Sequence, residues 1–434
     1  MLADTTLSMR FLFMGEALAV YGYMYQTSER VGLPEATSAR VFMLVALNLR
    51  LKVPLGYFFI DSLSRSERAS LTKKSIARVT SAGVDVVSLT FDGASSNFTM
   101  VRCLGPDLCY RSPDFATSFD CPTDSSKKIS IILDPCHMLK LVRNCLRSVD
   151  YLVDDEVSHI KWSYIEVLEV MQREEGMHLG NKLTKVHVER EKQNKMKIRL
   201  ALQTLSSSVA DTLDFCELTL RLPRFQGAHT TARFIRIFHS LFDLLNSRNP
   251  LAKSSKVALR NENAASWKAI LQEAENYITK LTCANERLVI ESLKKTGFVG
   301  LLICIRSAAN FFDCLVATGK MKYLLTHKMS QDHLEISFGC KREVRSSDSG
   351  NCAADVVTVL AVSSAISEVE STTVTHQRRC SVLEPFDDNH EYTYRVDLPR
   401  SLSPVVEAVV PYVAGFVARK NADSTSCEEC VAAL

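Results

Sequence analysis

The carboxylates that could do chemistry lie in two short stretches of the chain, 243 positions apart. Asp92 follows the apolar run 84–91, while Asp332 and Glu335 stand three residues apart in the second stretch. The apolar run predicts a buried strand, and the spacing of the second pair puts both carboxylates on one face of a predicted helix. Carboxylates gathered from distant segments hold the divalent ions of two-metal nucleases. Spacing alone leaves open whether they meet, and the alternative is that Asp92 caps a turn or a helix.

Strands and helices alternate before and after Asp92, which predicts an α/β fold with its chemistry at the strand ends. Ser64 and Glu67 form a capping-box pattern, Ser95 or Asn97 could cap the helix after Asp92, and Gly93 allows a sharp turn. The predicted strands are 41–47, 53–60, 84–91 and 129–133. The predicted helices are 64–81, a helix ending at 104, and one from Pro135 to about 149, with a polar loop at 112–128.

After about residue 153 the strand pattern disappears, and the chain shows helical spacing as far as 325. The helical stretches are 156–175, 182–215, 232–245, 263–282 and 285–325. A further helix is expected at 331–338, and the residues beyond 345 are poorly patterned. The sequence therefore predicts an all-helical block inserted into an α/β fold.

Composition excludes few classes of protein. The 434 residues are 46% hydrophobic and 23% charged, which is typical of a folded soluble chain, and no apolar run of membrane-spanning length is evident. The net charge of +3 is too small to indicate nucleic-acid binding. Seven lysines and arginines against two glutamates at 182–199 give a local positive excess, which fits either a solvated helix face or phosphate contacts. The fourteen cysteines suggest no disulfide framework, which favours a reducing compartment.

Several short motifs occur in a recognisable order over about two thirds of the chain. They are Phe42-Met43-Leu44, Pro54-Leu55-Gly56-Tyr57-Phe58, Phe91-Asp92-Gly93-Ala94-Ser95-Ser96-Asn97, Asp134-Pro135-Cys136-His137-Met138-Leu139-Lys140, Arg143-Asn144, Asn181-Lys182-Leu183-Thr184, Phe242-Asp243-Leu244-Leu245-Asn246-Ser247-Arg248, Lys295-Thr296-Gly297-Phe298 and Ser330-Gln331-Asp332-His333-Leu334-Glu335. In order and spacing they resemble the core of the P element-like transposases, which include the THAP-domain transposases. The resemblance implies an RNase H-like catalytic core interrupted by a helical insertion that binds GTP.

The resemblance also implies how the chain is organised. Residues 1–40 form an atypical N-terminus, 41–152 the N-terminal part of the RNase H-like domain, and 153–325 the GTP-binding insertion. Residues 326–345 carry the C-terminal helix of the RNase H-like domain, and 346–434 form the poorly patterned C-terminal region.

The resemblance assigns Asp92 as the second and Glu335 as the third of three catalytic carboxylates that bind Mg²⁺ or Mn²⁺. In the family the first carboxylate precedes the second by roughly seventy residues, but the window 17–28 contains no Asp or Glu. The sequence also lacks the pattern of the zinc-binding THAP module. The glycine- and asparagine-rich motif that the family has after Phe338 is matched only weakly, by residues 346–351. We therefore expect this chain to cut DNA inefficiently. His137 and Lys140 share a helix face, where a structural or DNA-phosphate role is favoured over that of a catalytic base.

For GTP, the resemblance implies a site without a phosphate-binding P-loop. It assigns Lys182 and Lys197 to the phosphates or base, Ser206 to a polar contact, Asp243 with Asn246 to the insertion motif, and Asp332 to guanine. A carboxylate can accept hydrogen bonds from guanine N1–H and N2–H₂, a pair that adenine lacks. The alternative is that these residues are solvated helix positions and caps.

The sequence thus predicts a P element-like DNA transposase, or a decayed or truncated copy, with metal-dependent cleavage and strand transfer and GTP as cofactor. The alternatives are a domesticated, non-catalytic GTP- or DNA-binding protein and a structural helical protein. The expected partners are transposon-end DNA and GTP. A homo-oligomer stays open, and no association with a membrane is expected. Nuclear localisation follows from the proposed role, and whether catalysis survives stays open.

Overall fold

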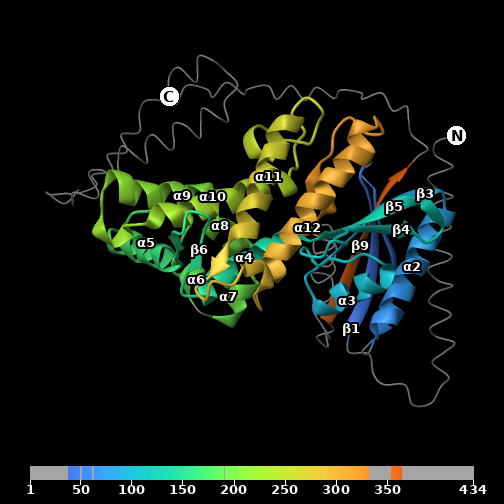
Figure 1. The fold of residues 1–434 in the computed structure, drawn as a ribbon, viewed down its shortest axis with the longest axis horizontal. Coiled ribbons are helices and arrows are strands. Elements are labelled where there is room, and N and C mark those ends of the chain that lie inside the picture. The colour runs from blue at the N-terminus through green and yellow to red at the C-terminus, as the bar shows by residue number, and fades with distance from the viewer. Residues whose placement is uncertain (1–37, 49–50, 61–62, 190, 332–352, 364–434) are drawn as a thin grey trace, which may run out of the picture. The chain divides into compact units, whose positions relative to one another are not determined.

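The structure is a computed structural model that describes residues 38–48, 51–60, 63–189, 191–331 and 353–363 (Figure 1). By its contacts the chain divides into two compact units, Met1–Met171 with Asn181–Ser363 and Gln172–Gly180 with Ser364–Leu434. The strands are β1 (Ser38–Ala46), β2 (Lys52–Ile60), β3 (Val84–Phe91), β4 (Ser118–Cys121), β5 (Asp124–Leu133), β6 (Leu152–Val153), β7 (His159–Ile160), β8 (Thr282–Cys283) and β9 (Ala353–Ser363).

The helices follow the same chain order. They are α2 (Arg65–Ser81), α3 (Ser95–Leu104), α4 (Pro135–Ser148), α5 (Ser163–Glu174), α6 (Lys185–Val188), α7 (Lys192–Met196), α8 (Ile198–Thr204), α9 (Ser207–Asp214), α10 (Ala228–Leu245), α11 (Ala264–Lys280) and α12 (Thr296–Phe311). The π-helical segments Phe215–Thr219 and Phe312–Ala317 continue α9 and α12.

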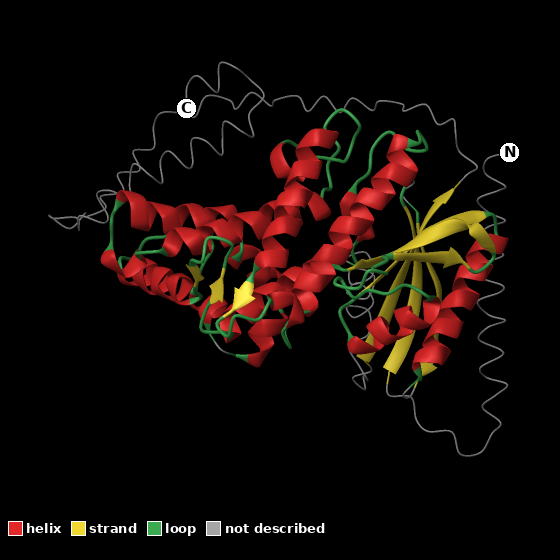
Figure 2. Ribbon diagram, viewed as in Figure 1, coloured by secondary structure: helices red, strands yellow, loops and turns green. Residues whose placement is uncertain are grey.

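A six-stranded mixed sheet forms the α/β part of the first unit, in the order β2-β1-β9-β3-β5-β4. Figure 2 shows its strands in yellow. β3 and β5 run parallel, so the two strands end at the same edge, where Phe91 pairs with Leu133. β9 lies between β1 and β3, parallel to the first and antiparallel to the second. The sequence predicts no element in this poorly patterned region, yet its strand fills a central position of the sheet.

Local sequence signals predicted several element boundaries correctly. β3 spans the predicted run, and Ser64 and Glu67 form the expected capping box at the start of α2. α4 begins at Pro135, as predicted.

Two expectations about this part of the chain are wrong. The predicted polar loop at 112–128 contains β4 and the start of β5, because a hairpin forms there. Neither Ser95 nor Asn97 caps α3, whose N-cap residue is Ala94.

Helices α4 and α12 cross at close range because glycines stand where they touch. A Cβ on Gly297 would lie 2.9 Å from two backbone atoms of α4, Met138 O and Val142 N. A Cβ on Gly300 would overlap the Met138 side chain. Gly93 packs against the same pair, since its Cβ would lie 2.9 Å from Met138 Cε. Gly93 does not adopt a left-handed backbone, so close packing requires this glycine, in place of the sharp turn that the sequence predicted.

α12 belongs to the core of the sheet domain. Its Cys304 Sγ and Ser307 Oγ donate hydrogen bonds to Leu133 O at 3.0 Å and Ile131 O at 2.6 Å, both on β5. With its π-helical continuation it forms a 22-residue helix, Thr296–Ala317, that contains an 18-residue window of mean hydropathy 1.7 and is long and apolar enough to cross a membrane by length and composition alone. Because 72% of that window is buried inside the protein, its hydrophobicity serves the core.

The helical block is not all-helical, which corrects the sequence prediction. β6, β7 and β8 form a small antiparallel sheet inside it, with Leu152 and Ile160 fully buried. Asp154 Oδ1 shapes the β6–β7 turn by accepting backbone N–H bonds from Glu156 and Ser158. Strands of two residues are too short to give an alternating pattern, so periodicity could not detect them. The predicted helix 182–215 is also divided, into α6, α7, α8 and α9.

Candidate functional site

Asp92 lies directly after β3, at the edge where β5 also ends. Its Oδ1 accepts hydrogen bonds from Ala94 N at 3.0 Å and from Asn97 Nδ2 at 2.9 Å. The turn-forming role that the sequence left open is therefore present at Oδ1. No described residue donates a hydrogen bond to Oδ2, so this oxygen is the one that a metal or other ligand would use.

Asp134 holds the neighbouring strand end together. Its backbone N–H donates to Phe91 O at 3.0 Å, and its Oδ2 accepts the His137 backbone N–H at 3.0 Å as the N-cap of α4. Its Oδ1 accepts the backbone N–H of Gln331 at 3.3 Å. Both carboxylate oxygens of Asp134 thus accept structural hydrogen bonds from backbone N–H groups. The same contacts bring Gln331 to the edge of the sheet that carries Asp92.

His137 and Lys140 lie on one face of α4, as predicted, with Lys140 Nζ 3.3 Å from His137 Nδ1. Burial, followed by the positive charge of Lys140, lowers the pKa of His137, while Asp92 opposes that shift. His137 is therefore neutral at pH 7 and senses the charge of Asp92.

The described residues do not complete a metal site. Asp332 and Glu335 lie outside the described residues, so the predicted approach of Asp92 and Glu335 stays a prediction, as does the missing acid at 17–28. Within the described part of the chain, no group of three His, Cys, Asp or Glu side chains could hold a metal ion. Mg²⁺ requires near-octahedral oxygen coordination, which Asp92 alone cannot organise.

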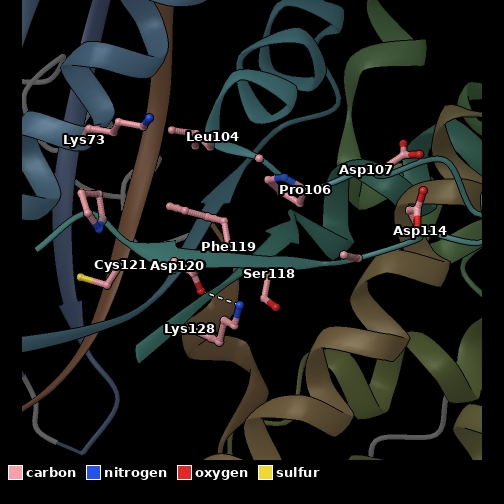
Figure 3. A pocket seen from close by; sticks show the side chains of 13 residues that line it. Lys73, Leu104, Pro106, Asp107, Asp114, Ser118, Phe119, Asp120, Cys121 and Lys128 are labelled. Carbon is pink, nitrogen blue, oxygen red and sulfur yellow. Dashed lines mark ion pairs between the residues drawn. The ribbon is translucent and has the colours of Figure 1, made fainter. Parts of the chain in front are cut away.

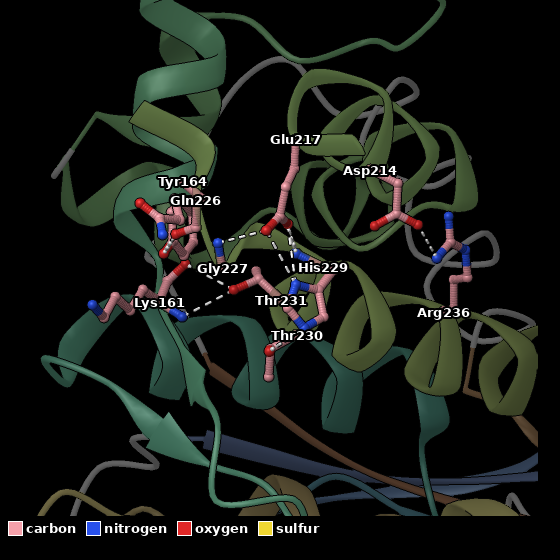
Figure 4. A network of polar contacts seen from close by, with 10 residues as sticks. All are labelled: Lys161, Tyr164, Asp214, Glu217, Gln226, Gly227, His229, Thr230, Thr231 and Arg236. Carbon is pink, nitrogen blue, oxygen red and sulfur yellow. Dashed lines mark hydrogen bonds and ion pairs between the residues drawn. The ribbon is translucent and has the colours of Figure 1, made fainter. Parts of the chain in front are cut away.

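A network of polar contacts fixes α9 against α10 in antiparallel order (Figure 4). Glu217, just after α9, accepts the backbone N–H bonds of Gly227 and His229 at the start of α10, at 2.7 and 2.6 Å. Further along, Arg236 on α10 pairs with Asp211 at 2.8 Å and Asp214 at 2.5 Å. The start of α9 therefore lies at the same end of this helix pair as the end of α10.

Three predicted nucleotide residues gather at that end. Ser206 precedes α9 and donates to Gln203 O at 2.9 Å. Asp243 lies in the last turn of α10, where it accepts the Ser255 hydroxyl at 3.1 Å, and Asn246 is the C-cap. Asp243 thus has local partners, as the alternative of a structural role requires, and the assignment of Asp243 and Asn246 to a nucleotide stays a prediction.

The two predicted lysines stand on separate anchored segments. Lys182 is exposed in the loop before α6, which is tied to α9 by the hydrogen bond from Asn181 Nδ2 to Thr212 Oγ1 at 3.2 Å. Lys197, also exposed, stands between α7 and α8 and donates to Asn194 Oδ1 at 3.1 Å. Both ammonium groups are therefore accessible to an anion. The sixth predicted residue, Asp332, lies outside the described residues.

Arg143 belongs to one of the sequence motifs, and the sequence pattern predicts no role for it. The structure buries this arginine completely on α4, beneath the segment that leads to Lys197. Its position three residues after Lys140 and four before Arg147 was the available signal, because that spacing puts three cations on one helix face.

A cavity of about 580 Å³ lies elsewhere, beside the edge strand β4 and the end of α3 (Figure 3). Lys128 and Asp120 form an ion pair of 2.5 Å on its wall. None of the predicted site residues lines it. This cavity therefore does not coincide with the candidate metal or nucleotide residues.

Two family models match the chain. A TNP-like RNase H N-terminal domain matches residues 5–105, which include Asp92 and the window 17–28. A TNP-like GTP-binding insertion domain matches residues 136–258, which include Lys182, Lys197, Ser206, Asp243 and Asn246. The chain is also 30% identical over 328 residues to the human protein DNA transposase THAP9, an alignment that covers 74% of this chain.

The chain belongs to the P element-like transposase family. The Drosophila melanogaster transposable element P transposase is 25% identical over 235 residues, covering 52% of this chain. The alignments span 35% and 29% of these two relatives, so the chain matches about a third of their length. The Drosophila P element transposase strand transfer complex has a similar fold, with a TM-score of 0.58 at 21% identity, covering 68% of this chain and 63% of that chain.

Family membership confirms the resemblance read from the motifs. It also confirms an α/β fold with an RNase H-like N-terminal domain and a GTP-binding insertion domain. The individual ligand assignments stay predictions.

Proposed function

We propose that this chain is a transposase core that binds DNA ends and a guanine nucleotide but cleaves DNA inefficiently. One observation carries this proposal. Gln331, which begins the segment containing Asp332 and Glu335, donates its backbone N–H to Asp134, whose own N–H is bonded to β3 next to Asp92. The chain therefore enters the predicted third-acid segment at the edge of the sheet that presents the second acid.

Asp92 and Glu335 are the residues proposed to hold Mg²⁺ or Mn²⁺. A bound divalent ion would stabilise the negative charge of phosphoryl transfer and activate a hydroxyl or water nucleophile. Asp92 suits this role because Ala94 N and Asn97 fix one carboxylate oxygen while the other accepts no hydrogen bond from described residues. Because 17–28 contains no Asp or Glu, only two of the three expected carboxylates would bind the metal ions. We therefore expect weak metal affinity and slow cleavage.

The nucleotide site is proposed in the insertion. Ser206, Asp243 and Asn246 stand at one end of the α9–α10 pair, and Lys182 and Lys197 supply exposed positive charge for phosphates. Asp332 is proposed to accept the guanine N1–H and N2–H₂ hydrogen bonds. GTP should then bind in preference to ATP, and Asp332→Ala should remove that preference, because buried guanine donors would lose their acceptor at about 1–3 kcal/mol each. Calorimetry with both nucleotides measures this, and equal affinities for the unmodified chain would refute the assignment of Asp332.

The domesticated, non-catalytic protein is the second candidate. The specific observation in its favour is that the window 17–28, where the first of the three carboxylates is expected, contains no Asp or Glu. Such a protein would bind GTP or DNA without cutting. For a chain that binds DNA, the nucleus is the proposed location.

The deciding experiment combines the purified chain with a labelled transposon-end duplex, Mg²⁺ or Mn²⁺, and GTP. The matched variants are Asp92→Asn and Glu335→Gln, with Asp120→Asn on the remote edge strand as a control. Slow cleavage that both site variants abolish supports the transposase core. Retained DNA or GTP binding without any cleavage favours the domesticated protein. Fast cleavage abolished by Glu335→Gln would show that a third acid exists and that inefficiency was wrongly inferred, and the absence of both binding activities would refute the proposal.

A further inference from the structure

Helix α4 carries a line of cations along one face. Lys140, Arg143 and Arg147 are spaced by three and four residues, which places them in register on successive turns. Lys140 and Arg143 are buried, with 4% and 0% of their surface exposed. Burying two cations on one helix face is unfavourable unless anionic or hydrogen-bonding groups compensate, so the partners of each cation are informative.

The partners of Arg143 are incomplete. Its Nη2 donates to Asn194 O at 3.2 Å and weakly to Lys195 O at 3.5 Å, both on α7. Its Nε and Nη1 are buried and find no hydrogen-bond acceptor among the residues that the structure describes. Two of the three guanidinium nitrogens are therefore unsatisfied in a fully buried side chain, which is rare because each such donor carries a desolvation cost.

The charges around Arg143 are also of one sign. Burial lowers the pKa of Arg143 to about 10, and Arg147 adds to the shift. Arg143 and Arg199 in turn help to lower the pKa of His187, after the larger effect of burial. No carboxylate among the described residues pairs with Arg143. The surroundings would therefore favour an added anion.

We propose that Arg143 is the anchor of a phosphate-binding site between α4 and the segment 194–197. The planar guanidinium matches phosphate oxygens, which would satisfy the two unpartnered nitrogens and neutralise the local positive charge. Lys197, on the same covering segment, is exposed at its rim. The inference rests on the proposed nucleotide function, which it deepens by adding a phosphate contact, but a DNA phosphate has the same chemistry.

The covering segment explains how such a site could be both buried and usable. α7 is only five residues long, and Arg143 and Asn144 contact it through the carbonyl groups of Asn194 and Lys195. Because Arg143 is fully covered, a phosphate reaches it only when α7 shifts. Ligand binding and the position of α7 are thus coupled through one side chain.

The test compares Arg143→Gln and Arg143→Lys with Arg236→Gln, a control arginine that already has two carboxylate partners. Calorimetry on the full chain measures affinity for GTP, guanosine and tripolyphosphate, and fluorescence anisotropy measures affinity for a labelled DNA duplex across salt concentrations. We expect Arg143→Gln to weaken GTP and tripolyphosphate binding about tenfold to hundredfold and to leave guanosine unchanged, since charge-assisted hydrogen bonds are lost only to phosphate. Arg143→Lys should fall in between, and Arg236→Gln should match the unmodified chain.

The outcomes separate the two phosphate sources and the two proposals. If Arg143→Gln loses affinity only for DNA, and its DNA affinity depends less steeply on salt concentration, the phosphate site stands and its ligand is a DNA phosphate. Tripolyphosphate binding that depends on Arg143, in a chain that binds no GTP, refutes the nucleotide function and keeps the site. Unchanged affinity of folded Arg143→Gln for all phosphate ligands overturns the inference, as does an equal loss for guanosine. If Arg143→Gln fails to fold, Arg143→Lys is decisive by the same criteria.

Discussion

Two pairs of packed helices in this chain are held together by different means. α4 and α12 meet through glycines and apolar side chains, and a Cβ on Gly297 would lie 2.9 Å from α4 backbone atoms. α9 and α10 also bury apolar side chains, but they add ion pairs at a partly exposed surface, where Arg236 contacts Asp211 and Asp214. Figure 4 shows the pair with Asp214. The first pair begins at Asp134 and so fixes the edge of the sheet that carries Asp92. The second pair carries Ser206 and Asp243.

The difference indicates which site tolerates adjustment. A close-packed helix crossing has little freedom, because interiors are packed as densely as organic crystals. Ion pairs at partly exposed surfaces contribute little each and can exchange partners with solvent. We therefore expect the strand-end site to be rigid and sensitive to substitution, and the nucleotide end of the insertion to adapt to its ligand.

Gly297→Ala should have the largest effect. Its new Cβ would meet Met138 O and Val142 N, which are backbone atoms and cannot rotate away. Overpacking of this kind costs about 1–3 kcal/mol, and we expect about 3 kcal/mol in the free energy of unfolding measured by urea denaturation. Gly300→Ala is the matched control, because there the obstacle is the flexible Met138 side chain. It should cost clearly less, and equal losses would show that backbone contact does not govern this crossing.

Glu217→Gln should have the second-largest effect. The Glu217 carboxylate accepts two backbone N–H groups at the start of α10, from Gly227 and His229. The amide keeps one acceptor oxygen and brings an NH₂ group against the other donor, so about 1–2 kcal/mol should be lost. Thermal unfolding with hydrogen-exchange mass spectrometry checks both the magnitude and its location. Loosening throughout α12, with α10 unchanged, would contradict this assignment.

Acidification should destabilise the α9–α10 pair before it destabilises the α4–α12 pair. Burial raises the pKa of Glu217, but the hydrogen bonds from Gly227 and His229 outweigh it, so the net pKa lies below the usual value. The stabilisation is therefore complete above the unfolded-state pKa, near 4.5, and is lost as the pH falls through the folded-state pKa. Hydrogen exchange measured at several pH values should show α10 opening before the α4–α12 crossing does. Simultaneous opening would remove the proposed contrast.

What the sequence predicted well was governed by local rules. The bounds of β3 followed from an apolar run of strand length, and the Ser64–Glu67 capping box and the α4 start at Pro135 followed from neighbouring residues. The motif order around Asp92 and Asp243 led to the correct family. These features need few long-range contacts, so a single sequence is sufficient to predict them.

What the sequence missed depends on distant partners. β9 enters the sheet between β1 and β3, although about 260 residues separate it from β3, and no local signal indicates that register. Arg143 resembles any solvated helix arginine until α7 covers it. The role of Gly93 changed for the same reason, since α4 and α12 come to lie against it. Tertiary packing decides each of these cases.

Arg236→Gln should have the smallest effect, and a double-mutant cycle can show why. The Arg236 side chain is 40% exposed, and its partners Asp211 and Asp214 are 46% and 22% exposed, so water screens much of the attraction. Pairs of this kind contribute about 0–1 kcal/mol, and we expect the single variant to lower the free energy of unfolding by about 0.5 kcal/mol. Removing the cation leaves two carboxylates three residues apart on α9, which repel each other. Asp211→Asn should therefore relieve part of the loss when combined with Arg236→Gln, and 1 M salt should shrink the coupling measured by urea denaturation. A coupling above about 2 kcal/mol that persists in salt would mean that this pair is as rigid as the glycine crossing, and the proposed contrast between the two sites would fail.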